Sequence, residues 1–142
     1  MAIIKEKKIK ITSVIENLDQ NGLTEGEPEK TETTSDGFYK IAEDSYLIMY
    51  SEQTDGGRVV SDIEIRDNFV SVKRRGGLES NLLFTEGESH KSLYTIPPYS
   101  FDVEIITKKI RNNLTRDGGR LDIFYTMKIG GQDKNIKMKI EI

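Results

Sequence analysis

Three side chains have the chemistry to orient a bound molecule: His90, Tyr94 and Tyr125. Each combines an aromatic ring with a polar tip, so it can pack against an apolar ligand and also form a hydrogen bond. His90 and Tyr94 are four residues apart and share one face of an extended strand, about 13 Å apart. We predict that all three converge on the interior or one mouth of the fold, with Arg120 as a rim cation. The alternative is that both tyrosine hydroxyls merely satisfy backbone groups in a filled core.

The sequence offers no catalytic constellation. His90 is the only histidine and has no obvious carboxylate beside it to orient the ring. The nucleophile motif Gly-x-Ser-x-Gly is absent. Two pairs of carboxylates alternate with apolar residues and are therefore expected in solvent. They are Asp62/Glu64 and Asp102/Glu104. No catalytic residue is predicted, and a binding module is favoured over an enzyme.

Composition excludes several other kinds of site. The 142 residues contain no cysteine and one histidine, which excludes thiolate metal sites, disulfide scaffolds and sites that need two imidazoles. The glycine pairs match no phosphate-binding motif. No metal and no cofactor is predicted. The net charge of −3 weighs against a dedicated nucleic-acid binder.

Apolar and polar residues alternate through nearly the whole chain. The clearest case is residues 136–142, where every second residue is isoleucine or methionine, a period of two that indicates a half-buried strand. One solvated face per strand indicates an antiparallel sheet. We predict an all-β, single-domain, up-and-down antiparallel barrel of about ten strands over residues 1–142, with a two-sheet β-sandwich as the alternative. The predicted strands are 8–18, 37–42, 45–52, 58–66, 69–75, 78–85, 88–96, 100–112, 119–129 and 134–142.

The hairpin around Asp67-Asn68 can be registered from sequence. A two-residue type I′ turn there places Ile65 opposite Val70 and puts an opposite-charge pair on the other face. A slip of one residue would destroy both features. The same periodicity predicts a largely aliphatic set of inward-facing residues: Ile63, Ile65, Val70, Val72, Val103, Ile105, Leu121, Ile123 and Met127.

Charge is distributed unevenly. Residues 19–36 are rich in acids, glycine and hydroxyl side chains, with Leu23 as their one apolar residue, and are predicted to form an acidic flexible loop. The basic runs Lys73-Arg74-Arg75 and Lys108-Lys109-Ile110-Arg111 are interpreted as solubilising charge at strand ends. A non-catalytic interaction protein that contacts RNA or a protein partner through these runs is the runner-up function.

The chain has no apolar run near the ~20 residues that cross a bilayer, and its start lacks the pattern of a signal peptide. We therefore expect a cytoplasmic protein without membrane contact. The sequence leaves the oligomeric state open between a monomer and a weak dimer.

The run Phe84-Thr85-Glu86-Gly87-Glu88-Ser89-His90, followed by Tyr94-Thr95-Ile96-Pro97-Pro98-Tyr99, resembles the YwiB-like bacterial domain of unknown function. The resemblance covers essentially the whole chain and implies a calycin-like barrel, similar to lipocalins and fatty-acid-binding proteins, with no assigned activity. Fatty-acid-binding barrels usually hold a carboxylate with Arg-x-Tyr on the last strand, where this chain offers Lys137 and Lys139. The favoured function is binding of a small amphipathic or apolar ligand in the barrel or at its mouth.

Overall fold

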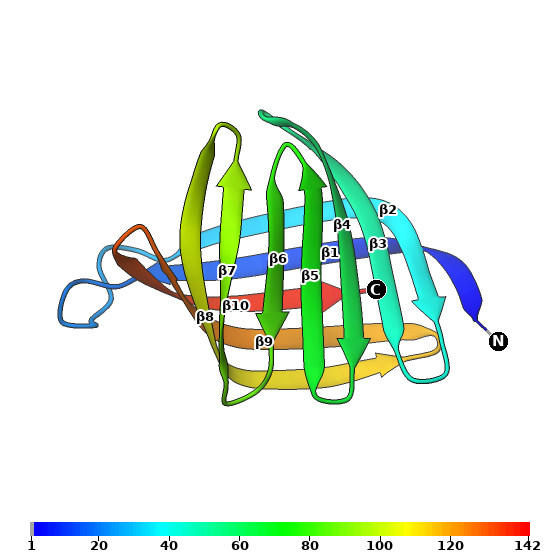
Figure 1. The fold of residues 1–142 in the computed structure, drawn as a ribbon. Coiled ribbons are helices and arrows are strands. Elements are labelled where there is room, and N and C mark those ends of the chain that lie inside the picture. The colour runs from blue at the N-terminus through cyan, green and yellow to red at the C-terminus, as the bar shows by residue number, and fades with distance from the viewer. Residues whose placement is uncertain (1) are drawn as a thin grey trace.

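The computed structural model describes residues 2–142, which form ten antiparallel strands (Figure 1). The strands are β1 (Ile3–Asn17), β2 (Glu29–Ile41), β3 (Tyr46–Thr54), β4 (Gly57–Arg66), β5 (Phe69–Gly76), β6 (Glu79–Phe84), β7 (Ser89–Ile96), β8 (Tyr99–Thr115), β9 (Gly118–Ile129) and β10 (Gln132–Glu141). Each strand pairs with the next along the chain, and β10 pairs with β1. The predicted closed up-and-down barrel is confirmed, and the sandwich alternative is wrong.

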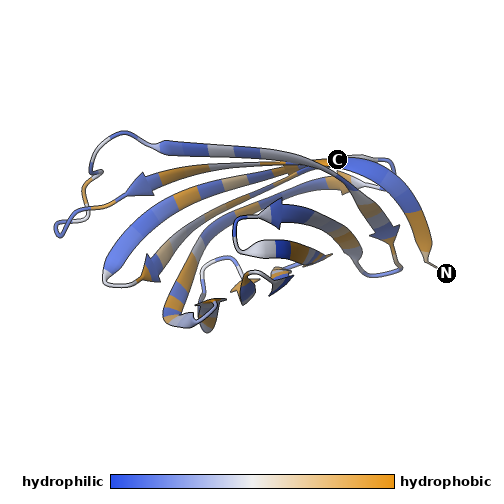
Figure 2. Cartoon of the chain, turned by 90° about the horizontal axis from the view of Figure 1, so that it is seen from above, coloured by the Kyte–Doolittle hydropathy of each residue, from blue (hydrophilic) through white to orange (hydrophobic). Residues whose placement is uncertain are grey.

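In Figure 1, β3–β7 lie in front of β1, β9 and β10, whereas β2 and β8 curve from one half of the barrel to the other. Seen from above in Figure 2, hydrophobic and hydrophilic residues alternate along the strands. The inward-facing residues predicted from this alternation lie in the hydrophobic core, with Met127 packed at its edge. Within residues 2–142 no helix is long and apolar enough to cross a membrane.

The hairpin of β4 and β5 has the predicted register, with Ile65 opposite Val70. On its outer face, Arg75 pairs with Asp62 at 3.2 Å. The turn itself is not type I′, because neither Asp67 nor Asn68 has a positive φ. Only glycines reach positive φ within residues 2–142, which is where that conformation costs least.

The acidic loop is shorter than predicted. β2 begins at Glu29, so the assignment of residues 29–36 to a flexible loop is wrong. The physical reason is long-range pairing with the basic outer face of β1, where Lys8 lies 2.8 Å from Asp36 and Lys10 lies 3.5 Å from Glu32. Residues 20–28 are all exposed, and the flexibility of this shorter connection stays a prediction.

Candidate functional site

Tyr94 and Tyr125 line the same cavity inside the barrel, which has a volume of about 390 Å³. Tyr94 comes from β7 and is half-buried, whereas Tyr125 comes from β9 and is 6% exposed. The Tyr125 ring meets Phe84 edge to face, with 4.8 Å between the ring centroids. The apolar part of the lining comes from β1, β5, β6, β9 and β10: Ile15, Val72, Leu82, Phe84, Met127, Ile129, Ile136 and Met138.

The cavity reaches the surface near the starts of β2 and β10. Its lining includes Thr31, which is exposed, and Ser13 and Lys134, which are half-buried. Lys134 is opposite Met127 in the β9–β10 ladder and therefore shares its inward face. The cation at the rim of the cavity is thus Lys134.

Arg120 does not join this site, and the prediction of Arg120 as a rim cation is wrong. It is exposed and its Nε lies 3.1 Å from a carboxylate oxygen of Asp122. Because Leu121 is fully buried, its neighbour Arg120 must point to the outer face of β9.

A row of polar side chains crosses the inner wall of the barrel from β3 to β7. Tyr50 is opposite Ser61, Ser61 is opposite Arg74, Arg74 is opposite Ser80, and Ser80 is opposite Tyr94. Opposed residues in antiparallel strands point to the same face. We call these five residues the inner polar row. Arg74 is the central residue of this row.

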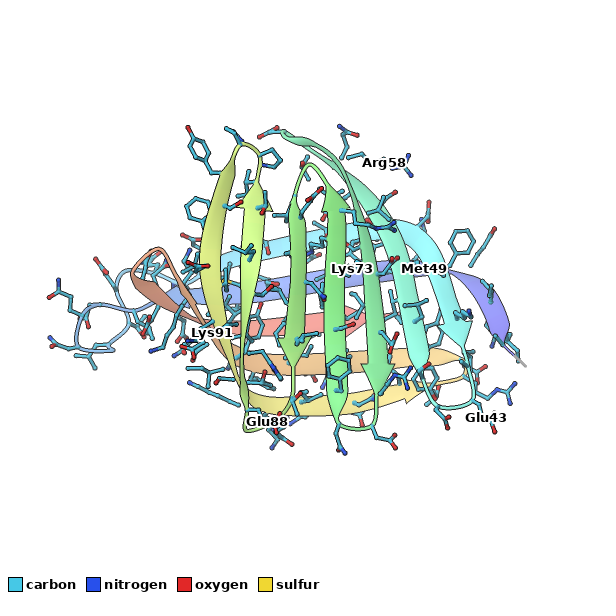
Figure 3. The ribbon with its side chains drawn as sticks, viewed as in Figure 1. Glu43, Met49, Arg58, Lys73, Glu88 and Lys91 are labelled. Atoms are coloured by element: carbon cyan, nitrogen blue, oxygen red, sulfur yellow. The ribbon has the colours of Figure 1, made fainter. Side chains whose placement is uncertain are left out.

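Arg74 is the main residue that the sequence analysis missed. The interpretation of Lys73-Arg74-Arg75 as solubilising charge is wrong at its middle residue. Lys73 (Figure 3) and Arg75 are exposed on the outer face, whereas Arg74 lines the cavity. The sequence does carry a signal for the inward position of Arg74. The alternation that predicts Val70 and Val72 in the interior continues with the same period of two to Arg74.

Several polar atoms of the inner wall are buried without a hydrogen-bond partner. Within residues 2–142 these are Arg74 Nε and the hydroxyls of Ser61, Ser80 and Thr107. Three belong to the inner polar row, and Thr107 is opposite Tyr125 on the far wall. Of these four residues, Arg74 is the one that lines the cavity. Buried polar groups normally find partners, so its unpaired Nε calls for water or a ligand beside it.

The charge inside the barrel is positive. Arg74 and Lys134 are the only charged residues that line the cavity, and among residues 2–142 Arg74 forms no ion pair. Burial lowers the pKa of its guanidinium, but the phenols of Tyr50, Tyr94 and Tyr125 outweigh burial and the net pKa is raised. The guanidinium is therefore charged at neutral pH. Burial raises the pKa of Tyr125 to about 12, with Arg74 acting in the opposite direction.

His90 lies apart from the two tyrosines, at the seam between β6 and β7. The ladder there has only two residue pairs, Glu79–Thr95 and Ser80–Tyr94. Beyond it, side chains bridge the strands: the Nε2 of His90 lies 3.1 Å from the hydroxyl of Thr85. The Nε2 of His90 also lies 3.8 Å from a carboxylate oxygen of Glu88, which is too far for a hydrogen bond that would orient the ring.

The predicted convergence therefore holds for Tyr94 and Tyr125, whereas His90 is not among the residues that line the cavity. His90 is opposite the buried Ile105 and therefore shares the inward face, but its ring bonds to Thr85 and lies about 13 Å along the strand from Tyr94. The arrangement as a whole can hold a small molecule between an apolar wall and a cationic, hydroxyl-rich one.

Known proteins with this fold give a family but no activity. The "Uncharacterized beta-barrel protein YwiB" of Bacillus subtilis (strain 168) is 27% identical over 126 residues, covering 89% of this chain and 84% of the relative. The crystal structure of the YwiB protein from Bacillus subtilis matches with a TM-score of 0.77 and 26% identity, over 97% of this chain and 94% of that one. The family model for the domain of unknown function DUF1934 matches residues 9–142, and the chain belongs to this family.

Proposed function

We propose that the protein binds a small amphipathic molecule inside its barrel. One observation carries this proposal: a cavity of about 390 Å³ places an apolar wall beside the phenols of Tyr94 and Tyr125 and beside Arg74, whose buried Nε lacks a partner. Pockets for small ligands have volumes of roughly 300–1,000 Å³ and combine apolar surface with a few polar groups. The apolar wall supplies affinity and the polar groups fix the orientation of the ligand.

Binding is favoured over catalysis by the same lining. It contains no carboxylate, imidazole or thiol that could act as a general base or as a strong nucleophile. We therefore propose a carrier or sensor that acts in the cytoplasm, and we propose no reaction.

The first test is native mass spectrometry of the protein purified from its own host. We expect a population heavier than the chain by the mass of one small molecule. Replacing both hydroxyls, as in Tyr94→Phe/Tyr125→Phe, should weaken binding about 30-fold, because each lost hydrogen bond contributes roughly 1 kcal/mol. Tyr99→Phe is the matched control, since Tyr99 is 67% exposed and does not line the cavity.

A neutral dye gives an independent measurement of the cavity. Nile red should bind the ligand-free wild type saturably at one site, with a rise in fluorescence. Absence of both a retained molecule and saturable dye binding would contradict the proposal, as would full ligand occupancy in the double variant.

A second candidate function is contact with single-stranded RNA, favoured by a basic row on the outside of the barrel. Neighbouring strands place Lys109, Phe124, Lys137, Val14 and Lys30 in register across β8, β9, β10, β1 and β2. The guanidinium of Arg111 and the ammonium of Lys137 each lie 5.7 Å from the Phe124 ring centroid. Cations around an aromatic platform suit the phosphates and bases of a single strand.

Fluorescence anisotropy with an oligouridine tests this candidate. Binding should weaken steeply as salt rises from 50 to 200 mM, and Lys108→Ala/Lys109→Ala/Arg111→Ala should lower both the affinity and the salt slope. Lys73→Ala/Lys91→Ala, on the outer face of β5 and β7, is the matched control. A triple variant that binds like the wild type would exclude RNA contact through this row and leave a protein partner as the other occupant.

A further inference from the structure

We infer that the ligand carries an oxyanion headgroup, and that Arg74 binds this headgroup at the centre of the inner polar row. The inference rests on the proposed function, because it assumes that the barrel takes an amphipathic molecule. It adds the chemical class of that molecule: an anionic amphiphile with a short apolar tail.

The first argument is uncompensated charge. Arg74 is half-buried and its Nε is out of contact with water. A cation withdrawn from water in this way is normally paired with an acid, because desolvation of a charge without a partner is unfavourable. The cavity around Arg74 is lined by a second cation, Lys134, and by no acid, although acids outnumber basic residues in the chain as a whole. The missing negative charge is therefore supplied most simply by the ligand.

The second argument is the arrangement of donors. Ser61 and Ser80 are directly opposite Arg74 on β4 and β6, one strand spacing of about 4.8 Å to either side. Their hydroxyls and the Nε of Arg74 are all buried and all lack a partner. Of the three residues, Arg74 lines the cavity, and the N–H donors of its guanidinium match the several lone pairs of an oxyanion. The two serine hydroxyls lie next to it on the same inner face.

The third argument is the position of the apolar surface. Val72 lies two residues from Arg74 on β5, and Leu82 lies two residues from Ser80 on β6, so both share the inner face. Both line the cavity, together with Phe84 beyond them. An anion on Arg74 therefore extends its apolar tail along these residues, with Lys134 at the mouth attracting the charged molecule from solution.

Isothermal titration of the ligand-free full chain with matched ten-carbon probes tests the inference. Decanoate should bind at least tenfold more tightly than decanol, and decylamine should bind more weakly than both, because the interior already carries uncompensated positive charge. Decyl sulfate is compared with decanoate to distinguish a tetrahedral headgroup from a planar carboxylate. Preference for either anion over decanol supports the inference.

The variants separate the headgroup from the cavity. Arg74→Gln should weaken decanoate binding about 10- to 100-fold, the effect of losing a charge-assisted hydrogen bond, and leave decanol binding unchanged. Arg75→Gln is the matched control on the same strand, because Arg75 is exposed and paired with Asp62 on the outer face. It should bind both probes like the wild type.

Three outcomes decide the question. Equal binding of decanol and decanoate by the wild type, with no effect of Arg74→Gln, overturns the oxyanion inference and leaves the proposed function standing, with ordered water on Arg74. Failure of all four probes and of Nile red overturns both. If Arg74→Gln does not fold, the relative affinities of the four probes for the wild type are compared with those for Arg74→Met. A preference for the anions that is present in the wild type and lost in Arg74→Met supports the inference, and equal affinities of the wild type for decanoate and decanol overturn it.

Discussion

Replacing Arg74 by methionine should stabilise the ligand-free barrel, raising the free energy of unfolding by about 1–2 kcal/mol. The guanidinium loses hydration on folding, and its Nε gains no partner in return. Methionine has a similar reach, is apolar and flexible, and packs on the neighbouring inward residues Val72 and Leu82. The gain in stability and the loss of anion binding in Arg74→Met have the same cause, because both follow from removing a cation that the ligand-free barrel holds without a counter-charge.

Urea unfolding of ligand-free protein measures this effect. The control Arg75→Met removes an exposed guanidinium that lies 3.2 Å from Asp62, and surface ion pairs contribute little, so its free energy of unfolding should stay within about 0.5 kcal/mol of wild type. Decanoate at saturating concentration should stabilise the wild type and not Arg74→Met. A loss of more than about 1 kcal/mol in Arg74→Met would mean that the folded protein already compensates the charge of Arg74.

The barrel was predictable because its signal is local and redundant. Each strand repeats its inward and outward residues with a period of two, and the β4–β5 hairpin has one register that pairs Ile65 with Val70. The same alternation correctly predicts that Leu121, Ile123 and Tyr125 of β9 face the core. Lys134 could have been placed by it too, because Ile136, two residues on, is an inward residue of the same strand.

Two arginines at the site are misplaced when they are judged by their charge and not by their position along the strand. Arg74 and Arg120 were each assigned by their charge, Arg74 to a solvated run and Arg120 to a rim, although the buried neighbours Val72 and Leu121 fix their sides of the strand. Other features were beyond local reasoning. The first half of β2 has no apolar signal and is held by pairing with β1. The β6–β7 ladder of two residue pairs is likewise a property of the closed barrel.

Raising the pH from about 10 to 12 should destabilise the barrel. Tyr125 alone should account for about 2 kcal/mol of the loss in the free energy of unfolding over this range. Burial raises the pKa of this phenol from 10.0 to about 12, with a smaller opposing effect of Arg74 and a further raising effect of Tyr94. A difference of two pKa units corresponds to about 2.7 kcal/mol. Burial raises the pKa of Tyr39 as well, so that its contribution has the same sign.

The sign follows from proton binding. Below pH 10 the phenol is protonated in the folded and in the unfolded chain, and its contribution to stability is fully present. Between the two pKa values the folded chain binds more protons than the unfolded chain, so the free energy of unfolding falls as the pH rises. Above the folded pKa both states are ionised and the contribution is lost.

Urea unfolding at a series of pH values, with tyrosinate absorbance followed in parallel, tests this expectation. Tyr125→Phe should unfold with a clearly shallower dependence on pH between 10 and 12, because the residue that takes up the differential proton is gone. Tyr99→Phe, at an exposed position, should keep the wild-type dependence. Arg74→Met should move the alkaline loss to higher pH, since it removes the charge that lowers the Tyr125 pKa. Equal slopes in Tyr125→Phe and wild type would contradict the assignment of a buried phenol to the cavity wall.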